Sequence, residues 1–202
     1  MSPIHTKELK PGVALITGGA KRIGKEIVKN LAYDGWKVII HYNKNSIAAK
    51  NLKNQITKRK GKAAIIKCDL NNNNSVKNLI EKSKKKFGNI SLLINNASKF
   101  ENDDIKNLNL ESWESHNNIN LKAPFILSQQ FAKALPKNSN GLILNLIDQR
   151  VLNLKPDFFS YTITKSALYT MTKTLALALA PRIRVNGIGP GPTLPNSRQT
   201  EQ

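Results

Sequence analysis

Two residues in the C-terminal half of the chain have types and a spacing suited to moving a proton. Tyr161 and Lys165 are one helical turn apart, and Asp148 precedes the tyrosine by thirteen residues. Residues four apart share one face of a helix, so the two side chains are expected to be neighbours. An ammonium beside a phenol is expected to lower the pKa of Tyr161 from its free value of about 10. Tyr161 is therefore a candidate proton donor and acceptor, although this spacing alone is typical of a surface helix.

A glycine-rich turn near the N-terminus is the second chemical signal. The apolar run 13–17 reads as a strand, and the segment TGGAKRIG at 17–24 follows it and opens a helix. Glycines let the backbone approach a pyrophosphate, and a helix N-terminus presents N–H groups to it. In the first strand–helix turn, this pattern predicts dinucleotide binding.

The end of the second expected strand predicts which dinucleotide is bound. A site selective for NAD places an acidic residue near this point to bind the ribose 2′-hydroxyl. The segment HYNKNS at 41–46 has no carboxylate, and Arg22 lies in the glycine-rich turn. His41, Asn43 and Lys44 suit a 2′-phosphate, so NADPH is predicted over NADH. The alternative is an ordinary polar turn.

Polar residues also follow the third and fourth expected strands. Asp69 suits a carboxylate that accepts a bond from the adenine amino group, or equally a residue that forms a turn. Asn95, Asn96 and Ala97 end the fourth strand, at the edge of the sheet where open α/β folds bind ligands.

Short apolar runs alternate with amphipathic segments along the whole chain. The expected strands are 13–17, 36–42, 63–67, 90–95, 142–147 and 183–187, and the expected helices are 22–33, 46–59, 75–87, 110–135 and 161–180. Ser75 is expected to cap the third helix, and the fourth is expected to break near Pro124. The alternation predicts a single α/β domain over 1–202, a Rossmann-type doubly wound parallel sheet with helices on both faces.

Composition narrows the class of protein. The chain has 202 residues and a formal charge of +19, from 32 Lys+Arg against 13 Asp+Glu. The lysines are spread over expected surface helices without a nucleic-acid motif, so solvated faces are favoured over specific nucleic-acid binding. The single cysteine, Cys68, is expected to be a buried, inert thiol. No signal peptide or membrane-spanning run is evident, which predicts a cytoplasmic protein with no membrane partner, and no metal-ligand set is predicted.

Taken together, these motifs resemble the short-chain dehydrogenase/reductase family from Val13 to about Thr193. Arg22 stands where most members have a glycine, and Asp148 stands where most have a catalytic serine. These departures, with His41-Tyr42 and the segment 96–100 (NASKF), resemble the pteridine-reductase branch. The resemblance implies an NADPH-dependent reductase that transfers hydride to a dihydropterin, a small-molecule substrate.

The resemblance also implies roles for individual residues. Tyr161 would be the proton donor, Lys165 would bind the nicotinamide ribose, and Asp148 would orient Tyr161 and the substrate. Asn120 would hold a water near the lysine, and Phe100 would stack the flat pterin against the nicotinamide. The implied cofactor-binding residues are Thr17, Gly18, Arg22, Ile23, Gly24, His41, Tyr42, Asn43, Lys44, Asp69, Leu70, Asn96, Ala97, Ser98, Lys165, Pro190 and Gly191.

Other interpretations stay open at this point. Asn120 could bond only to backbone, Phe100 could be a core aromatic, and Asp148 could cap the following segment. The substrate could be a ketone or a 3-oxoacyl thioester, and the chain could be a non-catalytic dinucleotide-binding module. Relatives continue past the Pro190-Gly191 turn with a lid, a helix and a strand, so that region is expected to be missing here. A homodimer or homotetramer is expected.

Overall fold

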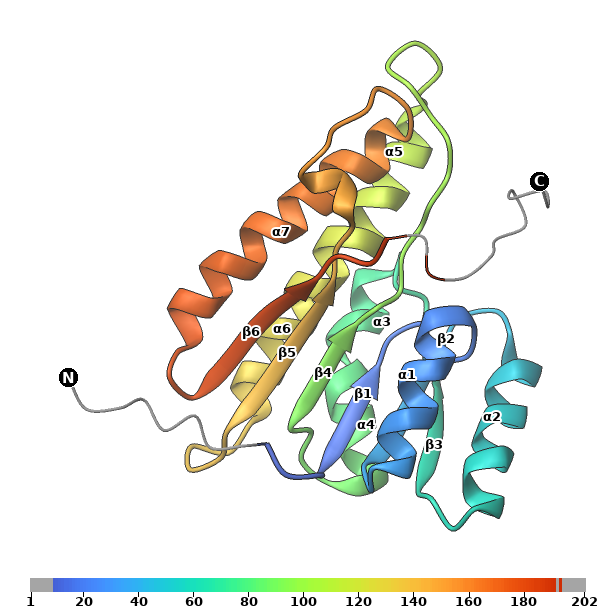
Figure 1. Ribbon diagram of the computed structural model, residues 1–202, viewed down its shortest axis with the longest axis vertical. Helices are drawn as coiled ribbons and strands as arrows, with labels where there is room; N and C mark the ends of the chain where they lie inside the picture. The colour runs from blue at the N-terminus through green and yellow to red at the C-terminus, as the bar shows by residue number, and fades with distance from the viewer. Residues whose placement is uncertain (1–8, 192, 194–202) are drawn as a thin grey trace.

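The computed structural model describes residues 9–191 and 193, and within them six parallel strands form one sheet in the order β3-β2-β1-β4-β5-β6 (Figure 1). The strands are β1 (Val13–Ile16), β2 (Lys37–Tyr42), β3 (Ala63–Lys67), β4 (Leu92–Asn95), β5 (Gly141–Leu146) and β6 (Ile183–Ile188). The order reverses between β1 and β4, which creates the crevice where such sheets bind ligands. The predicted Rossmann-type fold is confirmed. The end of the chain, where the lid of relatives would begin, falls at 192 and 194–202 and lies outside the described residues.

Helices pack on both faces of this sheet. They are α1 (Arg22–Tyr33), α2 (Ser46–Lys58), α3 (Asn73–Lys77), α4 (Leu79–Phe87), α5 (Leu110–Asn117), α6 (Ala123–Ala134) and α7 (Phe159–Leu179), with a π-helical turn η1 (Asn118–Lys122) and a 3₁₀ turn η2 (Gln149–Val151). In Figure 1, α1 and α2 cover one face over β1 to β3, whereas α4 and α6 lie behind the sheet, on the face that α7 also covers. None of the described helices has the length and apolar character needed to cross a bilayer.

Alternation along each strand divides the core into two halves. Leu15 and Ile39 pack toward α4, α6 and α7, whereas their neighbours Ile16 and Ile40 pack toward α1 and α2. Successive side chains in a strand point to opposite faces, so a strand buried on both faces must be apolar throughout. This explains why the expected strands appear in the sequence as continuous apolar runs.

Of two predicted helix details, the cap of the third helix was wrong, whereas the break of the fourth helix near Pro124 was confirmed. The third helix is split into α3 and α4, and its cap is Asn72, whose side chain accepts from the Ser75 N–H, so Ser75 is not the cap. The long fourth helix is interrupted at η1, before Pro124. Proline has no N–H to donate to the carbonyl of residue 120, and the preceding turn widens so that the Ala123 N–H bonds to the Asn118 carbonyl.

A chain of buried polar groups fixes α7 against the sheet. The Asn95 amide donates to Asn145 Oδ1 at 2.8 Å, and the Asn145 amide donates to Thr172 Oγ1 at 2.9 Å. Thr172 Oγ1 in turn donates to the Leu168 carbonyl at 2.7 Å. Buried amides and hydroxyls are costly without partners, so this chain permits one register of α7 on β4 and β5.

Removing the acceptor at Thr172 should therefore destabilise the fold. Thr172→Val keeps the shape but leaves the Asn145 amide unpaired, and it is expected to cost about 1–3 kcal/mol in unfolding free energy. Thr174→Val is the matched control, because Thr174 is exposed on the same helix and bonds only to its own turn among the described contacts. Urea denaturation measures both, and equal losses would contradict this role of Thr172.

Candidate active site

The glycine-rich turn lies at the carboxyl end of β1, and close packing defines it. Gly18 has a φ of 62°, and a Cβ on Gly24 would collide with the Gly18 carbonyl oxygen. The first turn of α1 therefore approaches the loop more closely than any side chain allows. This shape leaves backbone N–H groups at a helix N-terminus, which suits a pyrophosphate.

Side chains directly after β1 and β4 hold this loop from one side. Thr17 Oγ1 accepts from the N–H groups of Asn96 at 2.9 Å and Ala97 at 3.0 Å. The Asn96 amide donates to the Thr17 carbonyl at 2.8 Å and to the Gly18 carbonyl at 3.3 Å. Both side chains thus shape the crevice between β1 and β4.

His41 holds the loop from the other side, which corrects its predicted role as a donor to the cofactor. Its Nδ1 accepts from the Gly18 N–H at 3.0 Å, and its Nε2 donates to the Cys68 carbonyl at 3.0 Å. The ring is 2% exposed, and burial lowers its pKa to about 4, so it is a neutral imidazole. Both ring nitrogens are committed to backbone groups. Cys68 beside it is buried as predicted, and burial raises its thiol pKa to about 11.

The other residues predicted near the adenosine lie around the ends of β2 and β3. Asp69 Oδ1 accepts from the Asn71 N–H at 3.0 Å and from the Asn43 amide at 3.3 Å, so it does form a turn. Lys44 is exposed and Tyr42 is half-buried at the end of β2. Leu70 is buried in the core, Ile23 is half-buried and Arg22 is exposed at the start of α1.

Tyr161 and Asp148 form the centre of the site. Tyr161 Oη donates to Asp148 Oδ2 at 2.8 Å, and Asp148 Oδ1 accepts from the Arg150 N–H at 2.9 Å as the N-cap of η2. Asp148 therefore caps η2 and at the same time accepts the bond from the Tyr161 hydroxyl. The carboxylate is held so that one oxygen faces the phenol.

The pKa of Tyr161 is raised, which corrects the expected lowering. Burial is the main cause, and the hydrogen bond and negative charge of Asp148 add to it. Lys165 Nζ lies 5.6 Å from the centroid of the Tyr161 ring and donates to the Leu146 carbonyl at 2.6 Å. Burial lowers the pKa of Lys165 to about 8, so the amine is still mostly protonated at pH 7, but it bonds to the Leu146 carbonyl and does not offset the effects of burial and Asp148 on Tyr161. Because its pKa is raised, Tyr161 keeps its proton at neutral pH.

Asn120 links the substrate side of the site to α7. Its Oδ1 accepts from the Lys99 N–H at 2.7 Å and from Ser98 Oγ at 3.1 Å. Its amide donates to the Lys99 carbonyl at 3.0 Å and to Thr164 Oγ1 at 3.1 Å. Asn120 therefore makes more than the backbone contacts of a helix interior, because η1 turns it toward the segment after β4.

Aromatic rings gather beside Tyr161. Phe100 is 40% exposed, so it is no core residue, and its ring centroid lies 4.6 Å from that of Tyr161 at an interplanar angle of 68°. Phe158 stacks on Phe100 with centroids 4.3 Å apart and an angle of 6°. Sequence reasoning missed Phe158, although a Phe-Phe pair just before Tyr161 was a visible signal.

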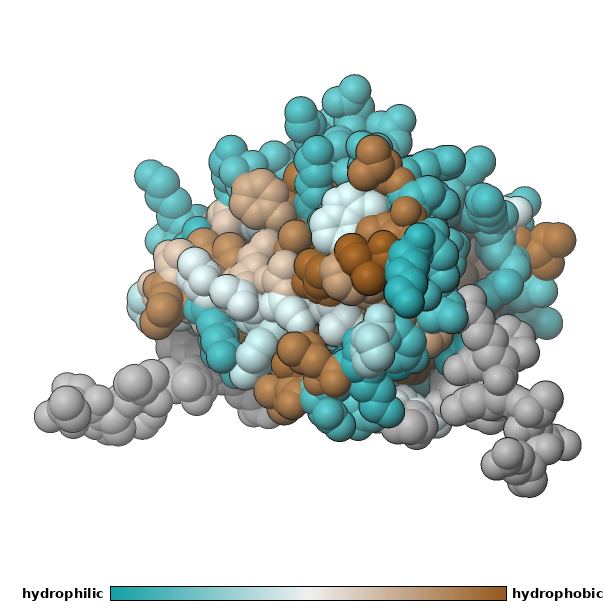
Figure 2. Space-filling view, turned by 90° about the horizontal axis from the view of Figure 1, so that it is seen from above, coloured by the Kyte–Doolittle hydropathy of each residue, from teal (hydrophilic) through white to brown (hydrophobic). Residues whose placement is uncertain are grey.

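The Pro190-Gly191 turn also comes to this edge. The Ile147 N–H bonds to the Ile188 carbonyl at 2.8 Å, and a Cβ on Gly189 would lie 3.7 Å from the Gln149 nitrogen. Figure 2 looks down on the carboxyl end of the sheet, where apolar surface is bordered by hydrophilic side chains. The predicted catalytic residues and the turn thus share one edge of the sheet.

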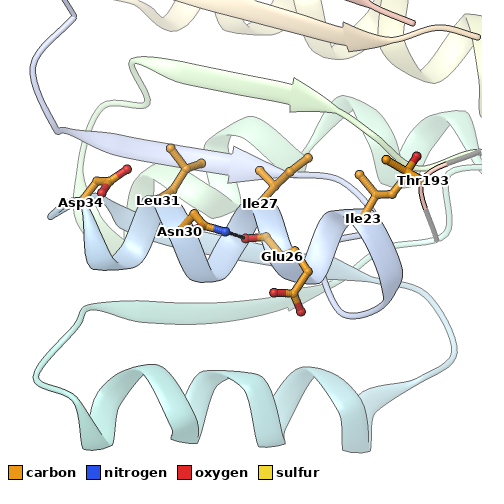
Figure 3. A pocket seen from close by; sticks show the side chains of 7 residues that line it. All are labelled: Ile23, Glu26, Ile27, Asn30, Leu31, Asp34 and Thr193. Carbon is orange, nitrogen blue, oxygen red and sulfur yellow. Dashed lines mark hydrogen bonds between the residues drawn. The ribbon is translucent and has the colours of Figure 1, made fainter. Parts of the chain in front are cut away.

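A groove of about 450 Å³ runs along α1 as far as Ile23, beside the phosphate loop (Figure 3). It is lined by Ile23, Glu26, Ile27, Asn30, Leu31, Asp34 and Thr193. Among these, only Ile23 belongs to the residues predicted to bind the cofactor. The groove is mostly apolar and contains none of the proton-handling groups.

The buried imidazole predicts an acid-sensitive fold. Unfolded histidine takes up a proton near pH 6.5, whereas native His41 resists it until about pH 4. Its contribution is therefore intact above pH 6.5 and is lost as the pH falls toward 4. Between pH 7 and pH 5, the unfolding free energy should drop by about 2 kcal/mol more than in His41→Gln, which cannot titrate. Urea titrations at both pH values measure this, and equal drops in the two proteins would contradict it.

Known proteins are similar to this chain in sequence and fold. A family model described as short chain dehydrogenase matches residues 12–202. The chain is 46% identical to the FolM alternative dihydrofolate reductase 1 of Brucella canis, solved with NADP, with a TM-score of 0.91 over 95% of this chain and 76% of that one. The Brucella suis FolM protein, also solved with NADP, is 47% identical, with a TM-score of 0.87 over 93% of this chain and 78% of that one.

A curated relative carries a different activity. The 3-oxoacyl-[acyl-carrier-protein] reductase of Synechocystis sp. is 31% identical over 180 residues, which span 89% of this chain and 73% of that protein. The similarity to alternative dihydrofolate reductases confirms the predicted resemblance to the pterin-reducing branch. The match over almost the whole chain settles the wider relationship: the protein belongs to the short-chain dehydrogenase family of oxidoreductases.

Proposed function

We propose that this protein is an NADPH-dependent reductase that transfers hydride to the C=N bond of a dihydropterin-like substrate. The observation that carries the proposal is the bond from Tyr161 to the Asp148 carboxylate, formed next to the ring of Phe100. This places a proton donor, a negative charge and a flat apolar surface together. The NADP complexes of the FolM relatives support the cofactor and the substrate class.

The residues of the chain fit an NADP-type cofactor. The glycine cradle would be filled by any side chain at Gly24, and the end of β2 presents Lys44 without a neighbouring carboxylate in the segment 41–46. Arg22 is exposed at the start of α1, where a cation suits a 2′-phosphate. Gly18 and Gly24 would receive the pyrophosphate, and Lys165 the nicotinamide ribose. When bound, NADPH supplies the hydride.

The protein's own groups manage the proton and the charge. Tyr161 stays protonated at neutral pH because its pKa is raised. The same shift makes the phenol a weak acid, so its proton would move to the substrate nitrogen only as hydride reaches the adjoining carbon. Asp148 holds the phenol in place and provides a fixed negative charge. Asn120 holds the segment that carries Phe100 against α7, so the ring and the acid keep their relative positions.

The charge of Asp148 favours a C=N bond over a ketone. Reducing a ketone develops negative charge on oxygen, which a neighbouring carboxylate opposes. Reducing a protonated C=N bond removes positive charge, and a carboxylate stabilises the protonated form beforehand. The carbonyl alternative rests on the Synechocystis relative, which is less similar to this chain than the FolM proteins. A homodimer or homotetramer remains part of the proposal.

NADPH oxidation in the presence of different acceptors tests the function. We expect turnover with dihydrobiopterin and dihydrofolate, little turnover with a ketone or 3-oxoacyl thioester panel, and a preference for NADPH over NADH. Turnover of carbonyl substrates alone would establish the carbonyl reductase instead. Tight NADPH binding with no turnover of any acceptor would identify a non-catalytic dinucleotide-binding module.

Tyr161→Phe tests the proton donor. The change removes only the hydroxyl and should lower kcat with dihydropterin by about 10²–10⁴-fold, the range typical of a positioned acid. NADPH affinity should be unchanged. Tyr169→Phe on the same helix is the control, since its ring contacts Lys173 and it should keep full activity. A Tyr161→Phe enzyme as active as the Tyr169→Phe enzyme would remove Tyr161 from the mechanism.

A further inference from the structure

Three planar groups are layered beside the catalytic tyrosine. The guanidinium carbon of Arg150 lies 5.0 Å from the centroid of the Phe158 ring, and Phe158 stacks in parallel on Phe100. We propose that Phe158 is a specificity-determining residue: it fixes the plane of the Phe100 ring and so selects substrates with a flat ring. This inference rests on the proposed reduction of a pterin-like heterocycle.

The backbone beside Phe100 is anchored, because Asn120 bonds to both backbone groups of Lys99, but such an anchor does not set the plane of the Phe100 ring, which depends on side-chain contacts. Phe100 lies in the segment 96–109, which contains no helix or strand. Tyr161 meets its ring at a steep angle, whereas Phe158 meets it face to face. A parallel neighbour defines the plane of an aromatic ring better than an edge contact does, because tilting the ring separates the two faces.

Phe158 reaches this position through an unusual backbone conformation. Its φ of 55° and ψ of 47° place it in the left-handed region, where a residue with a Cβ is disfavoured. It precedes α7 directly and makes no side-chain cap of its own. A conformation of this cost persists only where surrounding contacts impose it.

Asp103 imposes that conformation from the segment that carries Phe100. Its carbonyl accepts from the Phe159 N–H at 3.1 Å, and its Oδ1 accepts from the Ser160 N–H at 3.0 Å. The carboxylate is 6% exposed and lies at the N-terminus of α7, where the helix dipole favours negative charge. Asp103 therefore caps α7 in place of Phe158 and binds the Phe100 segment to the helix that carries Tyr161.

Arg150 completes the arrangement from the other side. Its guanidinium bonds to both carboxylate oxygens of Asp157 at 3.0 and 3.1 Å and to the Asp157 carbonyl at 3.1 Å. This fork holds the cation in one orientation on the Phe158 ring. The Arg150 N–H also bonds to Asp148, so one short turn positions both the catalytic carboxylate and the aromatic stack.

Equilibrium binding of flat and puckered ligands tests the inference without requiring turnover. The 202-residue chain saturated with NADP⁺ is titrated calorimetrically with biopterin, whose ring is aromatic, and with tetrahydrobiopterin, whose reduced ring is puckered. Phe158→Leu should weaken biopterin binding by about three- to tenfold and tetrahydrobiopterin binding less. Phe158→Tyr should bind both ligands as the unmodified protein does.

Phe159→Leu is the matched control. The same substitution falls one position along, on a ring that lies against Trp113 with centroids 6.4 Å apart. It should leave biopterin binding unchanged, and NADP⁺ affinity should be the same in all variants. The inference is overturned if Phe158→Leu leaves biopterin binding unchanged, if it weakens both ligands equally, or if Phe159→Leu has the same effect.

The test separates this inference from the proposed function. If the unmodified protein turns over no pterin but binds biopterin in a Phe158-dependent way, the proposed function fails and the inference holds. If turnover is found and Phe158→Leu changes neither ligand, the function holds and the inference fails. An unmodified NADP⁺ complex that binds no biopterin overturns the inference.

Discussion

The site depends on burying polar side chains of α7 against the strands. Lys165, Thr164 and Thr172 are all at most 5% exposed, and each must find a partner in the dry interior. Lys165 finds the Leu146 carbonyl, Thr164 finds Asn120, and Thr172 finds Asn145. A rotation or a shift of α7 by one residue would break these bonds together. The position of Tyr161, one turn before Lys165, follows from them.

The phosphate loop is held in a comparable way. Its shape is fixed by hydrogen bonds to its backbone rather than by charged side chains. Thr17, Asn96 and His41 all bond to main-chain groups in or beside the loop. These contacts leave the loop's shape independent of any ligand. A loop shaped in advance loses less conformational entropy on binding, which supports affinity for a dinucleotide. The buried neutral imidazole serves this purpose and, among the described contacts, takes no part in proton transfer.

Local patterns were sufficient to predict the elements, but not the environment of the site. The bounds of α1 follow from its periodicity and from the Asp34-Gly35 stop, and they matched the structure. The pairing of Tyr161 with Asp148 could be expected from the resemblance. The direction of the Tyr161 pKa could not, because it depends on burial and on the partner of Lys165, which are tertiary properties. The role of His41 was predicted wrongly for the same reason. The sequence shows a possible donor, but not that both ring nitrogens already bond to backbone groups.

Strained backbone conformations are distributed unevenly over the structure, and their positions bear on where the functional site lies. Three residues other than glycine have a positive φ: Arg22, Lys60 and Phe158 among those described. Lys60 ends α2 in an ordinary way, since its N–H bonds to the Thr57 carbonyl and the next N–H bonds to Ile56, a pattern that common helix ends use.

Arg22 and Phe158 have no such explanation from helix termination, because each stands at the beginning of a helix. Both lie at the carboxyl edge of the sheet, one beside the phosphate loop and one beside Tyr161. The buried Asp103 carboxylate, whose second oxygen has no hydrogen-bond partner among the described residues, lies there as well. Strained backbone and incompletely paired polar groups persist where function requires a geometry that stability alone would not select. Two of the three positive-φ residues other than glycine among those described lie at this edge, which supports placing the reaction there.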